Sequence, residues 1–326
     1  MISDYVDPQS YTKQEWNEEV KLINIIKREI KELETEFEYL EIKNLTDLKK
    51  SLKKYNKNEV VIFNWCEFLE EKEDTEYLVT EYLESQSFIF TGANTKCLKL
   101  TESKEKTKEK LTGNNIPTPK YVVIKKGAAL SNIGLSYPLM LKLENRHSSA
   151  GITNENVVYN YEQLCKVSER LFSDYHTNVL VEEFIDGQEY TVTAWGNGKK
   201  VSCIYITKEI YKDSKVSVIN TESSKFFHNS ADEKNLISKV VDKKNDKKNI
   251  IKINEIVVNS YRALNFFDYG RFELREKAGN FYVIDCNPNP WIGLSAVLFK
   301  GTKKLGYNYG ETILQICKFA VQRYMK

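Results

Sequence analysis

The chain has 326 residues, of which 41% are hydrophobic and 29% are charged. This composition is typical of a globular protein of about two domains and excludes a disordered chain. The formal net charge of +2 argues against binding of nucleic acid or a membrane surface by the protein as a whole. The longest apolar runs are far shorter than the ~20 residues of a membrane span. The acidic N-terminus is not a secretory signal.

The cysteines and histidines do not form a metal-binding pattern. The six cysteines contain no CxxC pair, and the three histidines are not clustered with them. We therefore expect buried or half-buried free thiols, as in a reducing cytoplasm, and no zinc site.

Helical and strand patterns alternate in the N-terminal part. Apolar residues at helical spacing predict a helix around residues 20–33, and a second helix is expected to begin at Thr46. A third helix is expected over residues 75–83. Short apolar strands are expected over residues 37–42, 59–65 and 88–90. This alternation predicts a small doubly wound α/β domain.

The rest of the chain contains further predicted elements and one long polar segment. Residues 99–111 are rich in Lys and Glu and are interpreted as a solvated surface helix. Residues 207–248 are interpreted as a long mobile loop, with a lid as its candidate role. Strands are expected over residues 121–124, 138–143 and 178–183, helices over 161–172, 250–264 and 311–324, and a hairpin over 271–275 and 281–286.

The predicted hairpin brings acidic and basic side chains together. Because strand side chains alternate, Arg271, Glu273 and Arg275 share one face, and Asp285 and Asn287 share one face of the neighbouring strand. Two carboxylates and an amide are hard oxygen ligands that suit Mg²⁺ carried with phosphates, and Arg271 can hold a phosphate oxygen. The alternative is a surface hairpin with ordinary charges, although an acid in an apolar strand requires a partner.

Two other segments have the character of nucleotide-binding elements. Lys142 lies on an otherwise apolar strand, and the small residues 148–151 that follow let backbone N–H groups close on an anion. A strand that runs into the polar connector 182–189 suits edge-on hydrogen bonding of an adenine, with Glu189 placed to reach ribose hydroxyls. Each pattern alone is better explained by an ordinary loop or strand end.

In this order, and with Lys104 upstream, these segments resemble the ATP-grasp superfamily and, within it, the D-alanine–D-alanine ligase family. The resemblance runs from about residue 58 to residue 297. It implies an α/β ATP-grasp fold with ATP held between two antiparallel sheets. The three implied parts are a Rossmann-like N-terminal α/β domain of residues 1–97, a central subdomain of residues 98–186 and a C-terminal subdomain of residues 187–326.

The resemblance also implies a role for each matching residue. Lys104 and Lys142 match lysines that hold the α- and β-phosphates, and Glu189 matches the acid that binds the ribose. The loop that folds over the phosphates matches Ser148, Ser149, Ala150 and Gly151. The hinge that binds adenine matches Glu182, Glu183, Phe184 and Ile185, and Ile284 is also assigned to the nucleotide site.

The implied metal and catalytic groups lie mainly on the hairpin. Glu273, Asp285 and Asn287 match magnesium ligands. Arg271 matches the arginine that stabilises the transferred phosphoryl group and the tetrahedral intermediate. Ser148 matches a serine that helps to order the active-site loops. A lysine of the 207–248 segment, for which Lys225 is the candidate, is expected to reach the γ-phosphate.

The implied activity is ATP-dependent ligation of a carboxylate and an amine. The carboxylate attacks the γ-phosphate to give an acyl phosphate, and the amine then displaces phosphate. The implied cofactors are ATP and two Mg²⁺ ions, with Mn²⁺ able to substitute, and the implied partners are amino-acid or dipeptide substrates, with a homodimer left open. Two alternatives remain: a phosphotransferase on the same scaffold, and a nucleotide-binding module without turnover.

Several positions depart from the family pattern. The N-terminus enters a helix almost directly, and no early acid that would hold the first substrate's amine is identified. Trp291 stands where the family has a glycine that lines the second substrate's pocket, and Ala296 stands where a serine binds a substrate carboxylate. Arg275 stands where an apolar residue covers the adenine. These departures preserve the ATP chemistry but argue against D-alanine as the substrate.

Overall fold

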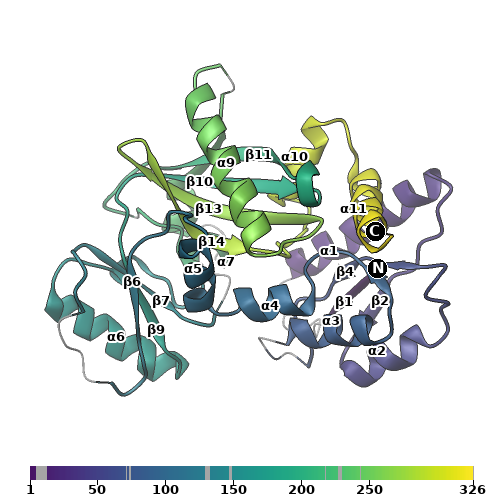
Figure 1. The fold of residues 1–326 in the computed structure, drawn as a ribbon, viewed down its shortest axis with the longest axis horizontal. Helices are drawn as coiled ribbons and strands as arrows, with labels where there is room; N and C mark the ends of the chain where they lie inside the picture. The colour runs from purple at the N-terminus through teal and green to yellow at the C-terminus, as the bar shows by residue number, and fades with distance from the viewer. Residues whose placement is uncertain are drawn as a thin grey trace.

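The structure is a computed structural model that describes residues 1–4, 13–70, 72, 75–128, 133–146, 149–216, 218–226, 230–242 and 244–325. Figure 1 shows an N-terminal α/β part on the right, a large antiparallel sheet in the centre and a smaller antiparallel sheet at the lower left. Within the described residues, no helix has the length and apolar character that a membrane span requires.

Short parallel strands form the N-terminal part. β1 (Ile2–Asp4) lies between β2 (Leu40–Ile42) and β4 (Asn64–Trp65), and β3 (Val61–Ile62) pairs with β5 (Ile89–Phe90). The helices between them are α1 (Lys13–Glu32), α2 (Leu45–Leu52) and α3 (Glu76–Ser85). The predicted α/β alternation is confirmed. The expectation that the chain enters a helix almost directly is wrong, because its first residues form the middle strand.

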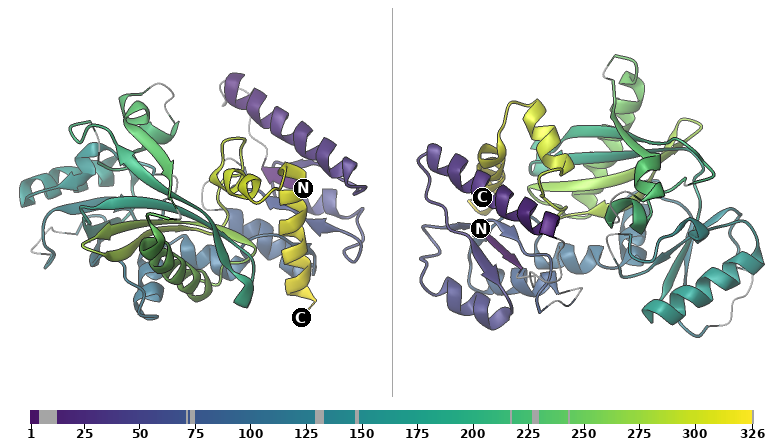
Figure 2. Two further views of the ribbon diagram at one scale, coloured as in Figure 1. Left: turned by 90° about the horizontal axis from the view of Figure 1, so that it is seen from above. Right: turned by 180° about the vertical axis from the view of Figure 1, so that it is seen from behind.

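The C-terminal helices close the N-terminal part. α11 (Tyr309–Tyr324) begins with a capping box of Asn308 and Glu311, and it packs along α1. Leu22 and Ile26 of α1 share a buried core with Ile313 and Ile316 of α11. α10 (Val297–Lys304) precedes this helix, and Figure 2 shows both C-terminal helices beside α1.

The smaller sheet is antiparallel and has the strand order β6-β9-β7-β8. Its strands are β6 (Tyr121–Ile124), β7 (Leu139–Leu143), β8 (Val157–Val158) and β9 (Val179–Glu183), with the short 3-10 helix η1 (Asn154–Asn156) before β8. α6 (Tyr161–Tyr175) packs its apolar stripe, which includes Leu164 and Leu171, against this sheet. The predicted strands and helix of this region are confirmed.

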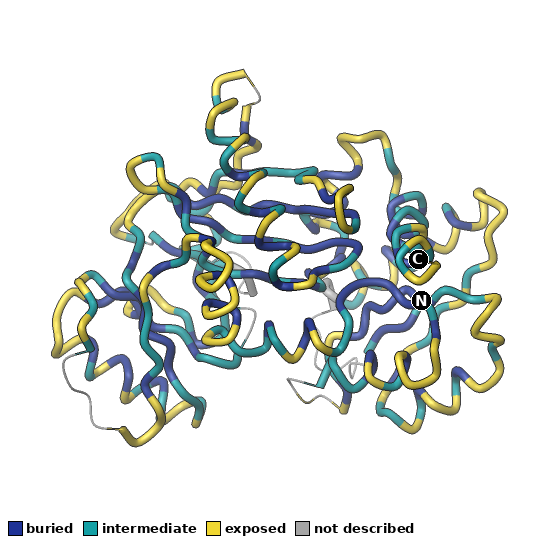
Figure 3. Tube along the Cα trace, viewed as in Figure 1, coloured by how far each residue is buried: buried dark blue, intermediate teal, exposed yellow. Residues whose placement is uncertain are grey.

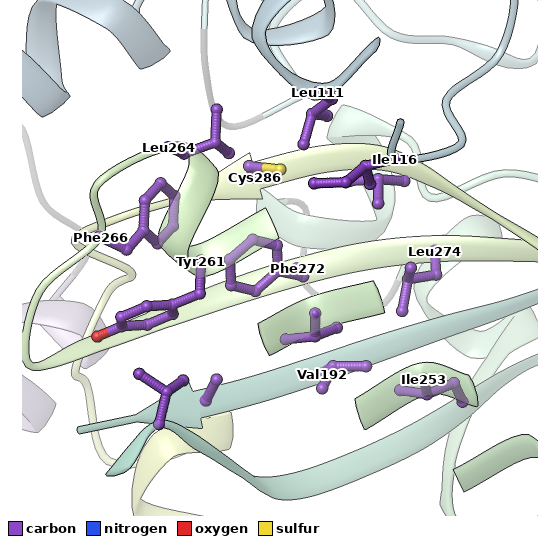
Figure 4. Packing of buried hydrophobic residues seen from close by; sticks show 14 of the residues in the cluster. Leu111, Ile116, Val192, Ile253, Tyr261, Leu264, Phe266, Phe272, Leu274 and Cys286 are labelled. Carbon is purple, nitrogen blue, oxygen red and sulfur yellow. The ribbon is translucent and has the colours of Figure 1, made fainter. Parts of the chain in front are cut away.

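The larger sheet is also antiparallel, with the order β12-β11-β10-β13-β14. Its strands are β10 (Gln188–Trp195), β11 (Ser202–Tyr211), β12 (Leu236–Val240), β13 (Tyr269–Lys277) and β14 (Asn280–Asn287), with the 3-10 helix η2 (Gly198–Lys200) between β10 and β11. α9 (Lys247–Ala263) covers one face, where Phe272 and Leu274 pack against Ile253 and Tyr261 (Figure 4). Alternate residues of β13 therefore face away from this core, as the sequence pattern predicts.

Two predictions about polar segments need correction. Residues 99–111 are not one surface helix, because α4 (Thr95–Thr101) ends before Ser103, which caps α5 (Lys104–Thr112). Lys108 of α5 is buried. The 207–248 segment is not one long loop either. β11 continues to Tyr211, α7 (Glu222–Phe226) and α8 (Ala231–Asn235) follow, and β12 adds an edge strand to the sheet. Figure 3 shows the central strands as the most continuously buried part of the molecule.

Close backbone approach explains one glycine between the two sheets. Gly187 lies in the connection from β9 to β10, and a Cβ built there would lie 1.9 Å from the carbonyl oxygen of Glu276. Only glycine permits this approach. The connection is therefore held against the end of the β13–β14 hairpin, which brings the two sheets together at one edge of the pocket described next.

Candidate active site

A pocket of about 660 Å³, including its mouth, is lined by residues of both antiparallel sheets. Lys142 and Phe184 come from the smaller sheet and its end, and Glu189, Glu273 and Asp285 come from the larger one. Lys104 at the start of α5 also lines the pocket. Charged groups of both signs therefore meet in one cavity, as expected of a site for an anion and its counter-cations.

Glu273 and Asp285 lie directly opposite each other on β13 and β14. The register shifts after Glu273, so that Ile284 and Asp285 both line the pocket although they are consecutive residues. Side chains of a regular strand alternate, and a β-bulge allows two neighbours to point the same way. The bulge thus places the Asp285 carboxylate beside an apolar wall formed by Ile284.

The oxygen groups of the hairpin fit a magnesium site. Opposed residues of antiparallel strands have Cβ atoms about 5 Å apart, which suits two carboxylates that share one cation. Arg271 Nη2 lies 3.5 Å from Glu273 Oε1. Asn287 faces Arg271 across the hairpin, and its Oδ1 accepts a hydrogen bond from the backbone N–H of Asn289 at 3.1 Å. An amide oxygen has two lone pairs, so Oδ1 of Asn287 can accept this hydrogen bond and also bind a cation.

The two predicted phosphate lysines are both in the pocket. Lys104 Nζ donates to the carbonyl oxygen of Arg146. Burial lowers the pKa of Lys104, and the charge of Asp285 opposes this. Burial also tends to lower the pKa of Lys142, but the negative charges of Glu182 and Asp285 outweigh this effect and raise its pKa. Lys142 therefore remains a cation within reach of the carboxylate that the hairpin supplies.

Glu182 lies between two lysines rather than at the surface of the pocket. Its carboxylate is 2.7 Å from Lys142 Nζ and 2.6 Å from Lys108 Nζ, and all three side chains are largely buried. Burial alone would raise the pKa of Glu182, but the two lysine charges lower it below its usual value. Lys108 also donates to Thr118 Oγ1 at 2.8 Å. The carboxylate is thus an ion-paired group that orients Lys142.

Lys108 was missed in the sequence analysis, although a signal was present. It lies four residues after Lys104 on one helix, and residues at that spacing share a face. A helix whose predicted phosphate lysine faces inward must therefore turn Lys108 inward as well. Because residues 99–111 are rich in charged residues, the sequence pattern did not reveal the inward-facing side of this helix.

The other end of the pocket is mainly apolar. Met140, Phe184 and Ile219 form a buried cluster there, and Ile152 packs against it. Such a surface suits the faces of a planar base. Of the predicted hinge residues, Glu183 does not line the pocket, and its Oε1 accepts a hydrogen bond from the backbone N–H of Ser136 at 3.2 Å.

Glu189 and Arg275 form a buried ion pair at the apolar end. Arg275 Nη2 lies 2.6 Å and Nε 3.1 Å from Glu189 Oε2. Arg275 Nη1 donates to the carbonyl oxygen of Ile185 at 3.1 Å, and its guanidinium lies 4.6 Å from the Phe184 ring centre. Arg275, which stands where the family has an apolar residue, is therefore a buried charge with its own ion-pair and hydrogen-bond partners.

The start of α7 contacts the small-residue loop. Glu222 Oε2 accepts a hydrogen bond from the backbone N–H of Gly151 at 2.9 Å, and the N–H of Glu222 donates to the carbonyl oxygen of Ile152 at 3.0 Å. Ser149 and Ala150 line the pocket beneath it. The predicted Ser148 lies outside the described residues, and Lys225 is placed only as a position in α7, since its side chain also lies outside them.

Three acids of the N-terminal part have raised pKa values and were also missed; Glu67 interacts electrostatically with Arg271, and Asp4 accepts a hydrogen bond from the N–H of Glu67. Burial raises the pKa of Asp4 to about 6 and that of Glu76 to about 8. The pKa of Glu67 is raised to about 7 by the surrounding protein and by Asp4, and Arg271 opposes this shift. Glu67 still exposes surface, so solvent weakens its shift more than that of Glu76. Asn289 Nδ2 donates to Glu76 Oε1.

Two antiparallel sheets that close on a pocket of lysines and acids define the class of the protein, the ATP-grasp fold. The computed structure superposes on that of the D-alanine–D-alanine ligase from Bacillus anthracis complexed with ATP with a TM-score of 0.74, at 18% identity, covering 99% of this chain and 97% of the ligase. A second structure of the Bacillus anthracis ligase gives a TM-score of 0.76 at 19% identity, with the same coverage.

Sequence comparison identifies the family within this class. A family model described as D-ala D-ala ligase C-terminus matches residues 111–318. The D-alanine–D-alanine ligase of Marinomonas sp. is 28% identical over 234 residues, which are 71% of this chain and 69% of that enzyme. That of Bacillus cereus is 24% identical over 246 residues, which are 74% of each chain. The chain therefore belongs to the D-alanine–D-alanine ligase family of ATP-dependent C–N ligases.

Proposed function

We propose that the protein joins a carboxylate and an amine of amino-acid-type substrates in an ATP-dependent reaction that passes through an acyl phosphate. The observation that carries the proposal is the opposed pair Glu273 and Asp285 in one pocket with Lys104 and Lys142. In this proposal the substrate carboxylate attacks the γ-phosphorus and ADP leaves. The amine then attacks the acyl carbon, and phosphate leaves with the C–O electron pair.

The charges of the pocket meet the main physical difficulty of this reaction. A carboxylate and a triphosphate repel each other, so cationic groups must offset their approach. Lys104 and Lys142 would hold phosphate oxygens, and Arg271 would hold the group in transfer. Mg²⁺ bound by Glu273, Asp285 and Asn287 would supply further positive charge at the phosphates.

An acyl phosphate must also be protected from water. The segment that includes Ile219 and Glu222 covers the pocket and contacts the small-residue loop through Gly151 and Ile152. Exclusion of water by such a cover favours attack by the amine over hydrolysis. Retention of this segment, together with the acids of the hairpin, favours a ligase over a nucleotide-binding module without turnover.

The substrate side of the site supports an amino acid other than D-alanine. Glu67 interacts electrostatically with Arg271 and with Asp4, and Glu76 with Glu67 and Asp4, so an ammonium group beside these acids would relieve their elevated pKa values. Trp291 is 48% exposed and packs over Gly293, where it offers a large apolar surface. We therefore propose amino-acid-type substrates other than D-alanine.

The wider setting is part of the same proposal. Cys66, Cys97 and Cys286 are buried free thiols, which suits a cytoplasmic enzyme. We also propose that the chain is divided into domains at residues 1–97, 98–186 and 187–326, and that it forms a homodimer.

The test is incubation of the protein with ATP, Mg²⁺ and a panel of amino acids and dipeptides, followed by mass spectrometry of the products. The proposal expects ADP, phosphate and a product whose mass is the sum of two substrates minus water. The Glu273→Gln variant should give none of these. A stable product carrying an added phosphoryl group would support the phosphotransferase instead. Nucleotide binding with no product across the panel would support the module without turnover.

A further inference from the structure

The ion pair of Arg275 and Glu189 joins three separate parts of the pocket. The two residues lie opposite each other on β13 and β10 and are 4% and 3% exposed. Besides Glu189, Arg275 binds the carbonyl oxygen of Ile185 in the connection after β9 and that of Val218 in the segment after β11. A single guanidinium thus links the hinge, the central sheet and the segment that covers the pocket.

The hydrogen bonds of Glu189 are concentrated on one oxygen. Nε and Nη2 of Arg275 and Oη of Tyr211 all donate to Oε2, the last at 3.2 Å. Within the described part of the chain, the other oxygen, Oε1, receives no hydrogen bond, and Glu189 lines the pocket. A carboxylate held through one oxygen can present the other to a hydroxyl group in a defined direction.

The third contact of Arg275 leads directly to the base-binding surface. Val218 precedes Ile219, which packs with Met140 and Phe184 at the apolar end of the pocket. Displacement of the Val218 carbonyl would therefore move Ile219 away from this surface. Conversely, a base seated there would favour the position in which Arg275 holds both Glu189 and the covering segment.

We propose that Arg275 is a positioning residue for nucleotide recognition, which aims Glu189 at a ribose hydroxyl and couples that contact to closure of the segment around Val218. This inference rests on the proposed function, because it requires ATP in the pocket, with its ribose at Glu189 as the family resemblance implies. Lysine cannot take over the role, because one ammonium group does not reproduce the planar set of donors that reaches three acceptors. Arg275 thereby gives the nucleotide site a charged positioning group where the family pattern has an apolar residue.

The experiment measures binding of ATP, 2′-deoxy-ATP and 3′-deoxy-ATP to the full chain by calorimetry in the presence of Mg²⁺. The variants are Arg275→Lys, Arg275→Met, Glu189→Gln and the double variant R275M/E189Q, with Arg262→Lys, which changes an exposed arginine of α9, as control. The wild type should lose roughly tenfold in affinity when the recognised hydroxyl is absent, as a charged hydrogen bond requires. The ratio of the affinity for ATP to that for the deoxynucleotide should fall to about twofold or less in every Arg275 or Glu189 variant. It should stay unchanged in Arg262→Lys.

Each other result has a defined meaning. A folded Arg275→Lys or Arg275→Met protein that keeps the wild-type ratio would show that the pair only stabilises the sheet, and the inference would be wrong. If Arg275→Met does not fold, R275M/E189Q removes both charges together and must match Glu189→Gln in its ratio. A wild type that binds all three nucleotides equally overturns this inference but leaves the proposed function standing. A wild type that binds no ATP overturns both.

Closure is followed by a second readout. ATP should protect residues 218–226 from proteolysis in the wild type and in Arg262→Lys, and protect them less in Arg275→Lys. Equal protection in Arg275→Lys would contradict the coupling of the ribose contact to the covering segment.

Discussion

The Nζ atom of Lys108 lies 2.6 Å from Oε2 of Glu182, and both side chains are at most 5% exposed. Glu182 holds Lys142 through its other oxygen at 2.7 Å, so Lys108 acts on the pocket through a shared carboxylate. In Lys108→Met, Glu182 keeps Lys142 as its only lysine partner, and Lys142 would be drawn more strongly toward Glu182. We expect the KM for ATP to rise about tenfold, together with a loss of about 2–4 kcal/mol of unfolding free energy.

The matched control for this change is Lys106→Met, which alters an exposed lysine on the same helix. Steady-state kinetics and urea unfolding measure the two effects. A Lys108→Met protein with unchanged KM and stability would show that Glu182 does not need its second partner.

Neutralising the opposed carboxylates should abolish turnover while the fold remains. Glu273→Gln and Asp285→Asn keep the size of each side chain but remove the negative charge that would hold the cation. We expect a loss of at least about 100-fold in kcat, with a thermal midpoint close to that of the wild type. Glu255→Gln, on the exposed side of α9, serves as the control. Activity within a few fold of the wild type in either variant would place the metal elsewhere.

The acid cluster of the N-terminal part should make stability depend on pH. The pKa of Glu76 is raised from 4.5 to about 8, mainly by burial, so the folded protein binds more protons than the unfolded chain between these values. Its contribution is fully present below about pH 4.5 and is lost as the pH rises toward 8. Glu76→Gln removes this titration and should stabilise the protein at pH 8 more than at pH 5, by on the order of 1 kcal/mol.

Thermal unfolding at the two pH values, with and without the substitution, provides the measurement. Gln can still accept the hydrogen bond that Asn289 donates to Glu76 Oε1. A Glu76→Gln protein that gains the same stability at both pH values would contradict the assigned pKa shift.

A buried ion pair holds the N-terminal part, the large sheet and the last helix together. Arg323 Nη2 of α11 lies 3.1 Å from Asp268 Oδ2 and donates to the carbonyl oxygen of Phe90 at 2.7 Å. Asp268 is fully buried and also accepts a hydrogen bond from the N–H of Gly92. Arg323→Met leaves this carboxylate without its cation and should cost about 3–5 kcal/mol of unfolding free energy.

The comparison variant is Lys54→Met, which removes the exposed ion pair of Lys54 with Glu38. Solvent screens exposed pairs, so this change should have little effect on stability. Denaturant unfolding of both variants measures the two changes in unfolding free energy. Similar losses of stability in the two variants would show that Arg323 does not hold the N-terminal part, the large sheet and the last helix together.

The hairpin was predictable from the sequence because strand alternation and a four-residue turn are local properties. Spacing alone could assign Arg271 and Glu273 to one face of their strand, and Asp285 and Asn287 to one face of the neighbouring strand. The bulge that places Ile284 beside Asp285 could not, since it depends on the register between two strands. The strand Ile2–Asp4 was missed because three residues carry too little pattern to distinguish a buried strand from a flexible end.

The partners of the charged residues were the least predictable part of the site. Glu182 was expected at the base-binding hinge, but long-range packing places it between two lysines. Arg275 was recognised as unusual, yet its pairing with Glu189 follows from the register of β10 on β13. The polar composition of residues 207–248 concealed the edge strand β12, since edge strands are exposed and often charged.

The central claim is that a substrate carboxylate is activated by transfer of the γ-phosphoryl group of ATP. The most direct measurement uses substrates labelled with ¹⁸O in the carboxylate, chosen from the panel by product formation, and follows the label by mass spectrometry of the released phosphate. Our account predicts phosphate that carries one ¹⁸O atom for each C–N bond formed. Release of unlabelled phosphate alongside a condensed product would contradict it, because the acyl phosphate would then have no part in the reaction.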